Sequence, residues 1–209
     1  MKRIRITFSK TDLLRFIGHL DLHHLWVRTF RRAGLQLVYS QGFHPQPKLH
    51  LASALSLGYT GSNEIMECWF EEDLPLEEIQ ARLTERSHPG IVIRELEVID
   101  ASALPLQIRL NGARYQINIP ARAAVGLDQK LKELFARDEI IIDRKNKPVN
   151  IRPFLLDFAL NESDETEPRL LDLHLAAGEN HNGRVDEVLD LLQIDPLDCL
   201  VERTSLEIA

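Results

Sequence analysis

The chain has 209 residues, of which 44% are hydrophobic and 27% charged, as expected for a globular protein with one large core or two smaller domains. Its formal net charge of −7 at pH 7 argues against broad nonspecific binding to nucleic acid. The apolar runs are too short for a transmembrane helix, the charged N-terminus is unlike a signal peptide, and Cys68 and Cys199 lie far apart, so we expect a cytoplasmic protein without membrane contact.

The first half of the chain reads as strand, helix, strand, strand, helix, strand. Near the N-terminus, Arg3, Arg5 and Thr7 alternate with isoleucine and phenylalanine, which is the period of a half-buried strand. Gly34 stands where a left-handed helix cap is expected. The predicted elements are a strand over 2–8, a helix over 20–33, an extended piece over 35–39, a loop over 40–47, strands over 48–57 and 64–70 joined by a turn at 58–62, a helix over 76–83 with Asp73 as its cap, and a strand over 91–99.

The second half repeats this order. Its predicted elements are a strand over 113–119, a helix over 127–136, an extended piece over 139–143, a loop over 144–148, strands over 149–160 and 170–176 joined by an acidic, solvated segment at 161–167, a helix over 184–192 and a strand over 200–208. We therefore predict an α+β protein of two ferredoxin-like (βαββαβ) units side by side, with antiparallel sheets and helices on one face. The units are expected at 1–104 and 105–209.

Positive charge is concentrated at the front of the chain. The first fifty residues hold nine Lys/Arg and two Asp/Glu, whereas the remaining residues hold 16 Lys/Arg and 30 Asp/Glu. Five of the eight histidines also lie in this stretch. The predicted helix over 20–33 buries one apolar stripe and places Arg28, Arg31 and Arg32 on the opposite face. Such crowded guanidinium groups suit phosphate; the alternative is a solvated face, paired with acids of the second half.

The loop over 40–47 points to a binding site more specifically than the helix arginines do. Its two prolines stiffen the backbone, and Gly42 permits a positive φ angle, so the polar side chains are presented at low entropic cost. Phe43 either stacks on a base or anchors the loop to the core, and the sequence favours the anchor. The predicted binding residues here are Ser40, Gln41, Gly42, Phe43, His44 and Lys48. Arg152 opens a strand at the corresponding place in the second half, and is either a further binding residue or an ordinary surface arginine.

The histidines raise two chemical hypotheses. His19 and His23 are four residues apart and could share a metal ion with His44 or His50, but no carboxylate or cysteine pattern supports this, so no metal site is predicted. The candidate acid–base residues are His19, Asp21 and His44, although the first two could simply cap the helix. The sequence has no phosphate-binding loop, dinucleotide fingerprint or nucleophile setting. Without three clustered cysteines it cannot hold its own iron–sulfur cluster, and no cofactor is predicted.

Several stretches together resemble a known family. They are Phe16-Ile-Gly-His19-Leu-Asp21, Phe30-Arg31-Arg32-Ala-Gly34-Leu, Tyr39-Ser-Gln-Gly-Phe-His-Pro-Gln-Pro-Lys48, Leu55-Ser-Leu-Gly58 with Glu64, Ile151-Arg152-Pro153 and Arg203-Thr204. With these motifs the chain resembles the radical SAM-linked small proteins of unknown function, the DUF2344 group, over nearly its whole length. Gly18 stands where serine is usual and His44 where asparagine is usual, so the family pattern does not support a chemical role for His44.

The resemblance implies an accessory role. Members of the group occur alone or fused behind a radical SAM, cobalamin-binding protein, often encoded near ribosomal-protein and ribonuclease genes. This implies a protein that presents RNA or a ribosomal component to a radical SAM partner, whose cluster performs the chemistry. Two alternatives remain open. One is a stand-alone RNA-processing or RNA-modifying enzyme that uses His19 or His44, and the other is a protein–protein adaptor.

Overall fold

The structure is a computed structural model that describes residues 1–161, 167–178 and 181–209, apart from the side chain of Asp12. In these ranges the chain has a mixed α+β fold with mostly antiparallel strand pairing and five α-helices. Two compact units are present: Met1–Leu110 with Ile208, and Asn111–Glu207 with Ala209. The acidic segment predicted at 161–167 lies largely outside the described residues. None of the helices in the described ranges is long and apolar enough to cross a membrane.

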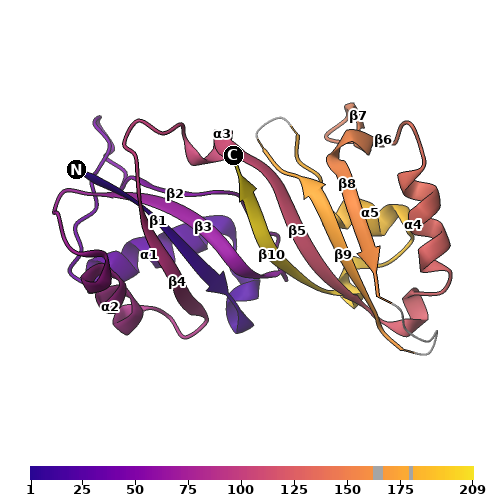
Figure 1. Cartoon of the computed structure of the whole chain (residues 1–209), viewed down its shortest axis with the longest axis horizontal. Helices are drawn as coiled ribbons and strands as arrows, with labels where there is room; N and C mark the ends of the chain where they lie inside the picture. The colour runs from indigo at the N-terminus through magenta and orange to yellow at the C-terminus, as the bar shows by residue number, and fades with distance from the viewer. Residues whose placement is uncertain (162–166, 179–180) are drawn as a thin grey trace. The chain divides into compact units, whose positions relative to one another are not determined.

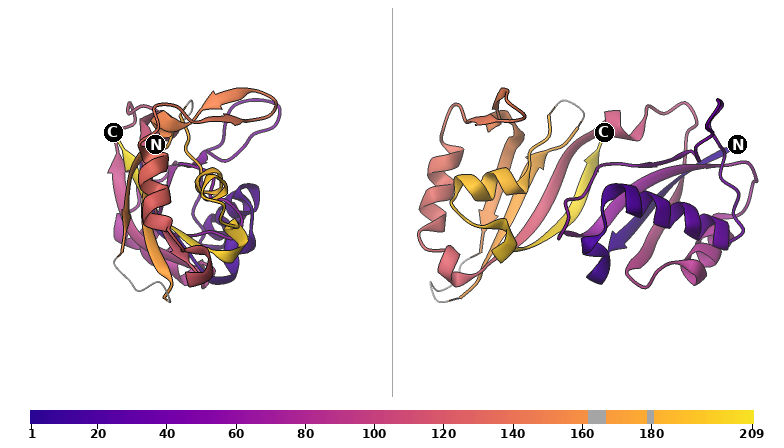
Figure 2. Two further views of the ribbon diagram at one scale, coloured as in Figure 1. Left: turned by 90° about the vertical axis from the view of Figure 1, so that its right-hand side faces the viewer. Right: turned by 180° about the vertical axis from the view of Figure 1, so that it is seen from behind.

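The first unit packs two long helices against one face of an antiparallel sheet (Figures 1 and 2). Its elements are β1 (Lys2–Lys10), the 3-10 turn η1 (Asp12–Phe16), α1 (His19–Arg32), β2 (Leu49–Leu51), β3 (Thr60–Phe70), α2 (Leu76–Arg86), β4 (Ile91–Ile99) and α3 (Leu106–Arg109). The strands lie side by side in the order β4-β1-β3-β2. In sequence order this places the fourth, first, third and second strands next to one another.

The core of the first unit lies between α1 and the central strands. Alternate residues of β1 point inward, so Ile4 and Ile6 pair across to buried Cys68 and Met66 of β3. Trp26 and Phe30 of α1 join the sheet through a series of aromatic contacts. The distances between ring centroids are 4.9 Å for Phe8–Trp26, 5.9 Å for Trp26–Phe30 and 5.6 Å for Phe30–Phe70. The apolar stripe predicted for this helix is confirmed, and its opposite face is therefore left for solvent or a ligand.

The second unit repeats the strand order of the first. Its elements are β5 (Leu110–Ile119), η2 (Ala121–Ala123), α4 (Leu127–Phe135), β6 (Ile141–Asp143), β7 (Pro148–Asn150), η3 (Arg152–Phe154), β8 (Leu155–Leu160), β9 (Arg169–Ala176), α5 (Val185–Leu191), η4 (Pro196–Asp198) and β10 (Leu200–Ile208). The main strands lie in the order β10-β5-β9-β8, again fourth, first, third, second. The short strands β6 and β7 form a separate hairpin.

Two predicted strands are shorter than expected. The strand predicted over 48–57 is limited to Leu49–Leu51, and residues 58–62 are not a hairpin turn. The reason is a long-range contact: Arg15 of η1 holds Gly58 through two hydrogen bonds, Gly58 N to Arg15 O (2.8 Å) and Arg15 Nε to Gly58 O (2.9 Å). The strand predicted over 149–160 is likewise broken, because η3 separates β7 from β8.

The boundary of the first unit differs from the one predicted from the sequence. The first unit continues past residue 104 to Leu110, because the unpredicted helix α3 is tied to its sheet; Gln107 donates to the Leu51 carbonyl at 3.0 Å and Arg109 pairs with Glu67.

The predicted cap of α2 is also wrong. Asp73 does not cap α2, which has no side-chain cap. Instead Asp73 pairs with Lys2 at 3.1 Å.

Candidate functional site

Two of the three predicted phosphate-binding arginines of α1 are available to a ligand. Arg28 and Arg31 are exposed, and within the described residues neither side chain forms an ion pair or hydrogen bond. Arg32 differs, because its guanidinium donates to Thr29 Oγ1 (3.1 Å) and to the Arg86 carbonyl (2.9 Å) at the end of α2. Arg32 therefore fastens the two helices together, whereas Arg28 and Arg31 present their charge to solvent.

Much of the positive charge in the first fifty residues is neutralised within the first unit. Lys2, Arg3 and Arg5 of β1 pair with acids of the first unit, which lie at Asp73, Glu67 and Glu97. These acids belong to the same unit, not to the second half of the chain. Among the described residues, Arg28, Arg31 and Arg32 of α1 form no ion pair with an acid.

A buried charged cluster surrounds Glu67. This carboxylate is 0% exposed and accepts from Arg3 at 2.5 and 2.9 Å, from Arg5 at 3.0 and 3.2 Å, and from Arg109. Burial by itself raises the pKa of Glu67, but the hydrogen bonds from Arg3, Arg109 and Arg5 outweigh it and hold the pKa below its ordinary value. Arg3 also donates to the carbonyls of residues 103 and 104 at 2.6 and 3.0 Å. The cluster therefore holds the segment before α3 to the sheet, which is a structural role.

His50 borders this cluster. It lies opposite Glu67 on β2, and its ring contacts Trp69 with 5.2 Å between centroids. Burial and, next, the charge of Arg3 lower the pKa of His50 below 6.5, so the imidazole is neutral at pH 7. In the described residues no three histidine, cysteine or acidic side chains come together in a way that could hold a metal ion.

The loop after α1 is closed by hydrogen bonds at its base. Ser40 N donates to Gln46 O (2.8 Å), Gln46 N donates to Ser40 Oγ (3.0 Å), and Tyr39 forms an isolated bridge with Pro47. Gly42 has a φ angle of 143°, which an L side chain rarely adopts. The loop is thus fixed at both ends, and all residues from 41 to 46 are exposed.

Phe43 does not anchor this loop to the core, as the sequence had favoured. Its side chain is fully exposed, because the closed base holds the middle of the loop away from the packed helix and sheet. His44 and Gln41 are also exposed, while Ser40 and Lys48 are half-buried. An exposed aromatic ring on a stiff loop is suited to stacking on a ligand.

Replacing Phe43 by alanine should leave the stability of the fold unchanged to within about 0.5 kcal/mol, because the ring makes no buried contact. Thermal unfolding followed by circular dichroism measures this. As a matched comparison, Phe30→Ala removes a buried ring of α1 and should lower the melting temperature strongly. A clear loss of stability in Phe43→Ala would restore the anchoring role.

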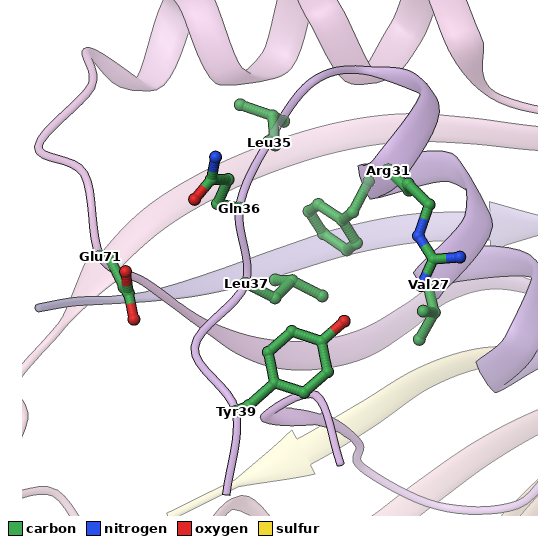
Figure 3. A pocket seen from close by; sticks show the side chains of 8 residues that line it. Val27, Arg31, Leu35, Gln36, Leu37, Tyr39 and Glu71 are labelled. Carbon is green, nitrogen blue, oxygen red and sulfur yellow. The ribbon is translucent and has the colours of Figure 1, made fainter. Parts of the chain in front are cut away.

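A pocket of about 310 Å³ lies beside the exposed arginine face (Figure 3). It is bounded by the C-terminal half of α1, by the extended segment 35–39 and by Glu71 at the end of β3. Figure 3 shows Arg31 and the Tyr39 hydroxyl on one side of the pocket and Glu71 on the other. The apolar lining residues are Val27, Phe30, Leu35 and Leu37, and the polar ones are Arg31, Gln36, Tyr39 and Glu71.

Sequence reasoning found only Arg31 among the polar groups of this pocket. Gln36, Tyr39 and Glu71 were missed, because they are brought together by the pairing of Leu37 with Phe70 at the edge of β3. The one local signal was Tyr39, an aromatic residue directly before the stiff loop. The helix-start candidates His19 and Asp21 do not line the pocket; His19 precedes Arg31 by twelve residues, about 18 Å along a helix axis.

Arg152, in the second unit, has a supporting role. Its guanidinium donates to the carbonyls of Phe135 (2.8 Å), Arg137 (3.0 Å) and Leu155 (2.8 Å). Two of these carbonyls lie at the C-terminal end of α4, where backbone acceptors have no helical partner. Arg152 therefore caps α4 and links it to β8.

The two cysteines are unreactive in their environments. Both are free and buried. Burial raises the pKa of Cys68, and burial together with Asp198 and Asp195 raises the pKa of Cys199 to about 11. Both thiols are protonated at neutral pH, so neither provides the thiolate that nucleophilic chemistry requires.

Comparisons with known proteins give one family assignment. No curated protein matches the sequence. Among solved structures, one described as a "putative glycine cleavage system transcriptional repressor" is 12% identical, with a TM-score of 0.29, over 100% of this chain and 97% of the other; this likeness carries no argument about function. The model of DUF2344, described as an uncharacterized protein conserved in bacteria, matches residues 3–185. The chain therefore belongs to the DUF2344 family.

Proposed function

We propose that this protein is a cytoplasmic accessory protein that binds single-stranded RNA, free or in a ribosomal component, and presents it to a radical SAM, cobalamin-binding enzyme. The observation that carries the proposal is the pair Arg28 and Arg31, exposed on α1 and without partners in the described residues. Arg31 also lines a pocket together with Tyr39, the residue directly before the stiff loop that bears the exposed Phe43.

These groups match the chemistry of single-stranded RNA. The guanidinium groups of Arg28 and Arg31 can bind phosphate through two parallel hydrogen bonds each. Phe43 and Tyr39 offer aromatic faces on which unpaired bases stack. The +1 charge of each arginine is confined to one helix face, so binding is compatible with the overall negative charge of the protein.

The architecture supports a binding scaffold. We propose that both units are ferredoxin-like, because, leaving aside the separate β6–β7 hairpin, the main elements of each follow the chain order strand, helix, strand, strand, helix, strand and its strands have the same spatial order, fourth, first, third, second. The radical SAM partner is proposed from the family resemblance. In this division of labour the partner supplies the cluster and the chemistry, and this chain supplies substrate binding.

A protein–protein adaptor is the second candidate. Three large apolar side chains, Leu13 and Phe16 of η1 and Leu20 in the first turn of α1, are 77%, 66% and 71% exposed. Exposed apolar groups this close in sequence favour contact with another protein. An adaptor would leave RNA unbound, whereas the first proposal requires RNA binding by the purified chain.

The double substitution Arg28→Ala/Arg31→Ala should weaken binding of a fluorescein-labelled single-stranded RNA roughly tenfold or more at low salt, because two phosphate contacts are lost. The slope of log affinity against log salt should become shallower by about 1.4, from about 0.7 for each phosphate contact. Fluorescence anisotropy at several salt concentrations measures both quantities.

The matched control is Lys130→Ala/Arg137→Ala, which removes two exposed positive charges from the second unit. It should leave affinity and slope nearly unchanged. Equal affinities of the wild type and the Arg28/Arg31 variant would overturn the RNA proposal. Absence of RNA binding by the wild type would favour the adaptor.

A further inference from the structure

The pocket beside Arg31 has hydrogen-bond donors on one side and acceptors on the other. Arg31 and the Tyr39 hydroxyl provide donors on one side, and the Glu71 carboxylate provides acceptors on the other (Figure 3). Gln36, which can donate and accept, completes the polar lining. The groups between these sides are largely apolar, as at Leu37. A ligand that uses the whole pocket therefore has an anionic end, a flat or apolar body, and an end rich in N–H groups.

Size and charge separation narrow the ligand class. A volume of about 310 Å³ is at the lower end for small-molecule pockets, which is enough for one nucleotide unit. An α-amino acid carries its ammonium and carboxylate on a single carbon, so its charges lie together, whereas Arg31 and Glu71 lie on opposite sides of the pocket. A nucleotide has its phosphate and the outer edge of its base at opposite ends, with the ribose between them.

Among the four common bases, guanine fits the Glu71 side. Its N1–H and N2 amino group are adjacent donors, which one carboxylate can accept together, and its O6 can accept from the Gln36 amide. Adenine and cytosine present a ring acceptor beside the amino group, and uracil flanks its single N–H with two carbonyls. A carboxylate would repel those acceptors.

We infer that this pocket binds a guanine nucleotide, with the base edge on Glu71 and Gln36 and the phosphate on Arg31. The inference rests on the proposed RNA-binding function, since it assigns a guanine of the bound RNA to the pocket. The Tyr39 hydroxyl, on the Arg31 side, offers a further donor to the phosphate end. Arg28, which does not line the pocket, then remains available to a neighbouring phosphate of the RNA.

Calorimetric titration of the full chain with GMP, IMP and AMP tests the assignment. We expect GMP to bind roughly tenfold more tightly than AMP, because a good two-point contact to a base edge is worth about 1–3 kcal/mol. IMP lacks the N2 amino group and should fall between them. Glu71→Gln should bring the GMP-to-AMP ratio near one. Its matched control, Glu72→Gln, changes the adjacent exposed acid, which does not line the pocket, and should keep the preference.

The outcomes separate this inference from the RNA proposal. Equal affinity for GMP and AMP, or a preference that survives Glu71→Gln, overturns the guanine assignment even if RNA binding depends on Arg28 and Arg31. A GMP preference that depends on Glu71, in a protein that binds no RNA, overturns the RNA proposal instead. In that case the pocket is a site for a free guanine nucleotide.

Discussion

Replacing Glu67 by glutamine should lower the free energy of unfolding of the first unit by about 3–5 kcal/mol, the usual effect of removing one partner from a buried ion pair. The substitution keeps the size of the side chain but removes the charge that compensates Arg3, which is only 3% exposed. Arg5 and Arg109 also lose their shared acceptor. The variant then has three guanidinium groups around a neutral amide, and the segment before α3 is no longer firmly held.

Tryptophan fluorescence during urea unfolding measures this effect in the first unit alone. The two tryptophans of the chain, Trp26 and Trp69, both lie in that unit. The control is Glu97→Gln, which removes the partially exposed partner of Arg5, at 47% exposure, and should change stability by less than about 1 kcal/mol. If Glu67→Gln is no more destabilising than this control, the buried cluster does not stabilise the fold.

The stabilisation by Glu67 also has a predicted dependence on pH. Hydrogen bonds from the arginines lower the pKa of Glu67 in the folded state, whereas in the unfolded chain it returns to about 4.5. A carboxylate with a lowered folded pKa stabilises the fold fully above its unfolded pKa, and the contribution is lost as the pH falls through the folded value. The stability difference between wild type and Glu67→Gln should therefore shrink as the pH is lowered below 4.5.

The sequence predicts the elements whose patterns are local and strongly periodic. Alternation in β1 and the apolar stripe of α1 are set by neighbouring residues, and the structure confirms both. The predicted length of the strand over 48–57 is wrong, because the end of this strand depends on Arg15, which lies more than forty residues away in sequence. Alternation also places Glu67 on the face of β3 opposite the buried Met66 and Cys68, but a pattern within one strand cannot reveal that Arg109 covers it.

In the candidate site, too, the residues set by a local pattern can be predicted, and those set by long-range contacts cannot. Arg28 and Arg31 follow from helix periodicity, because the residues opposite an apolar stripe are exposed. The other side of the pocket requires Glu71, directly after β3, to lie near the segment 35–39, which is a long-range contact without a local signature. Phe43 shows the converse error: an aromatic residue near the core in sequence was assigned to packing, although the closed base of its loop holds it in solvent.

Replacing Trp26 by alanine should lower the free energy of unfolding of the first unit by about 3–5 kcal/mol, as is typical for large-to-small changes of a buried aromatic residue. Trp26 is 1% exposed; its ring packs edge-on against Phe8 at 4.9 Å and at a tilt against Phe30 at 5.9 Å. Alanine leaves a cavity between α1 and the sheet. The same helix carries Arg28 and Arg31, so loosening its inner face should also weaken RNA binding, in proportion to the unfolded fraction.

Trp26→Phe is the informative comparison. The indole Nε1 of Trp26 is buried and has no hydrogen-bond partner among the residues that the structure describes, so its removal offsets part of the lost packing. We expect this variant to be destabilised by clearly less than Trp26→Ala, with Trp69 fluorescence reporting urea unfolding of both. Similar losses in the two variants would mean that the indole N–H has a partner in solution. Full RNA affinity in a folded but loosened Trp26→Ala protein would show that the binding arginines do not depend on the packing of α1.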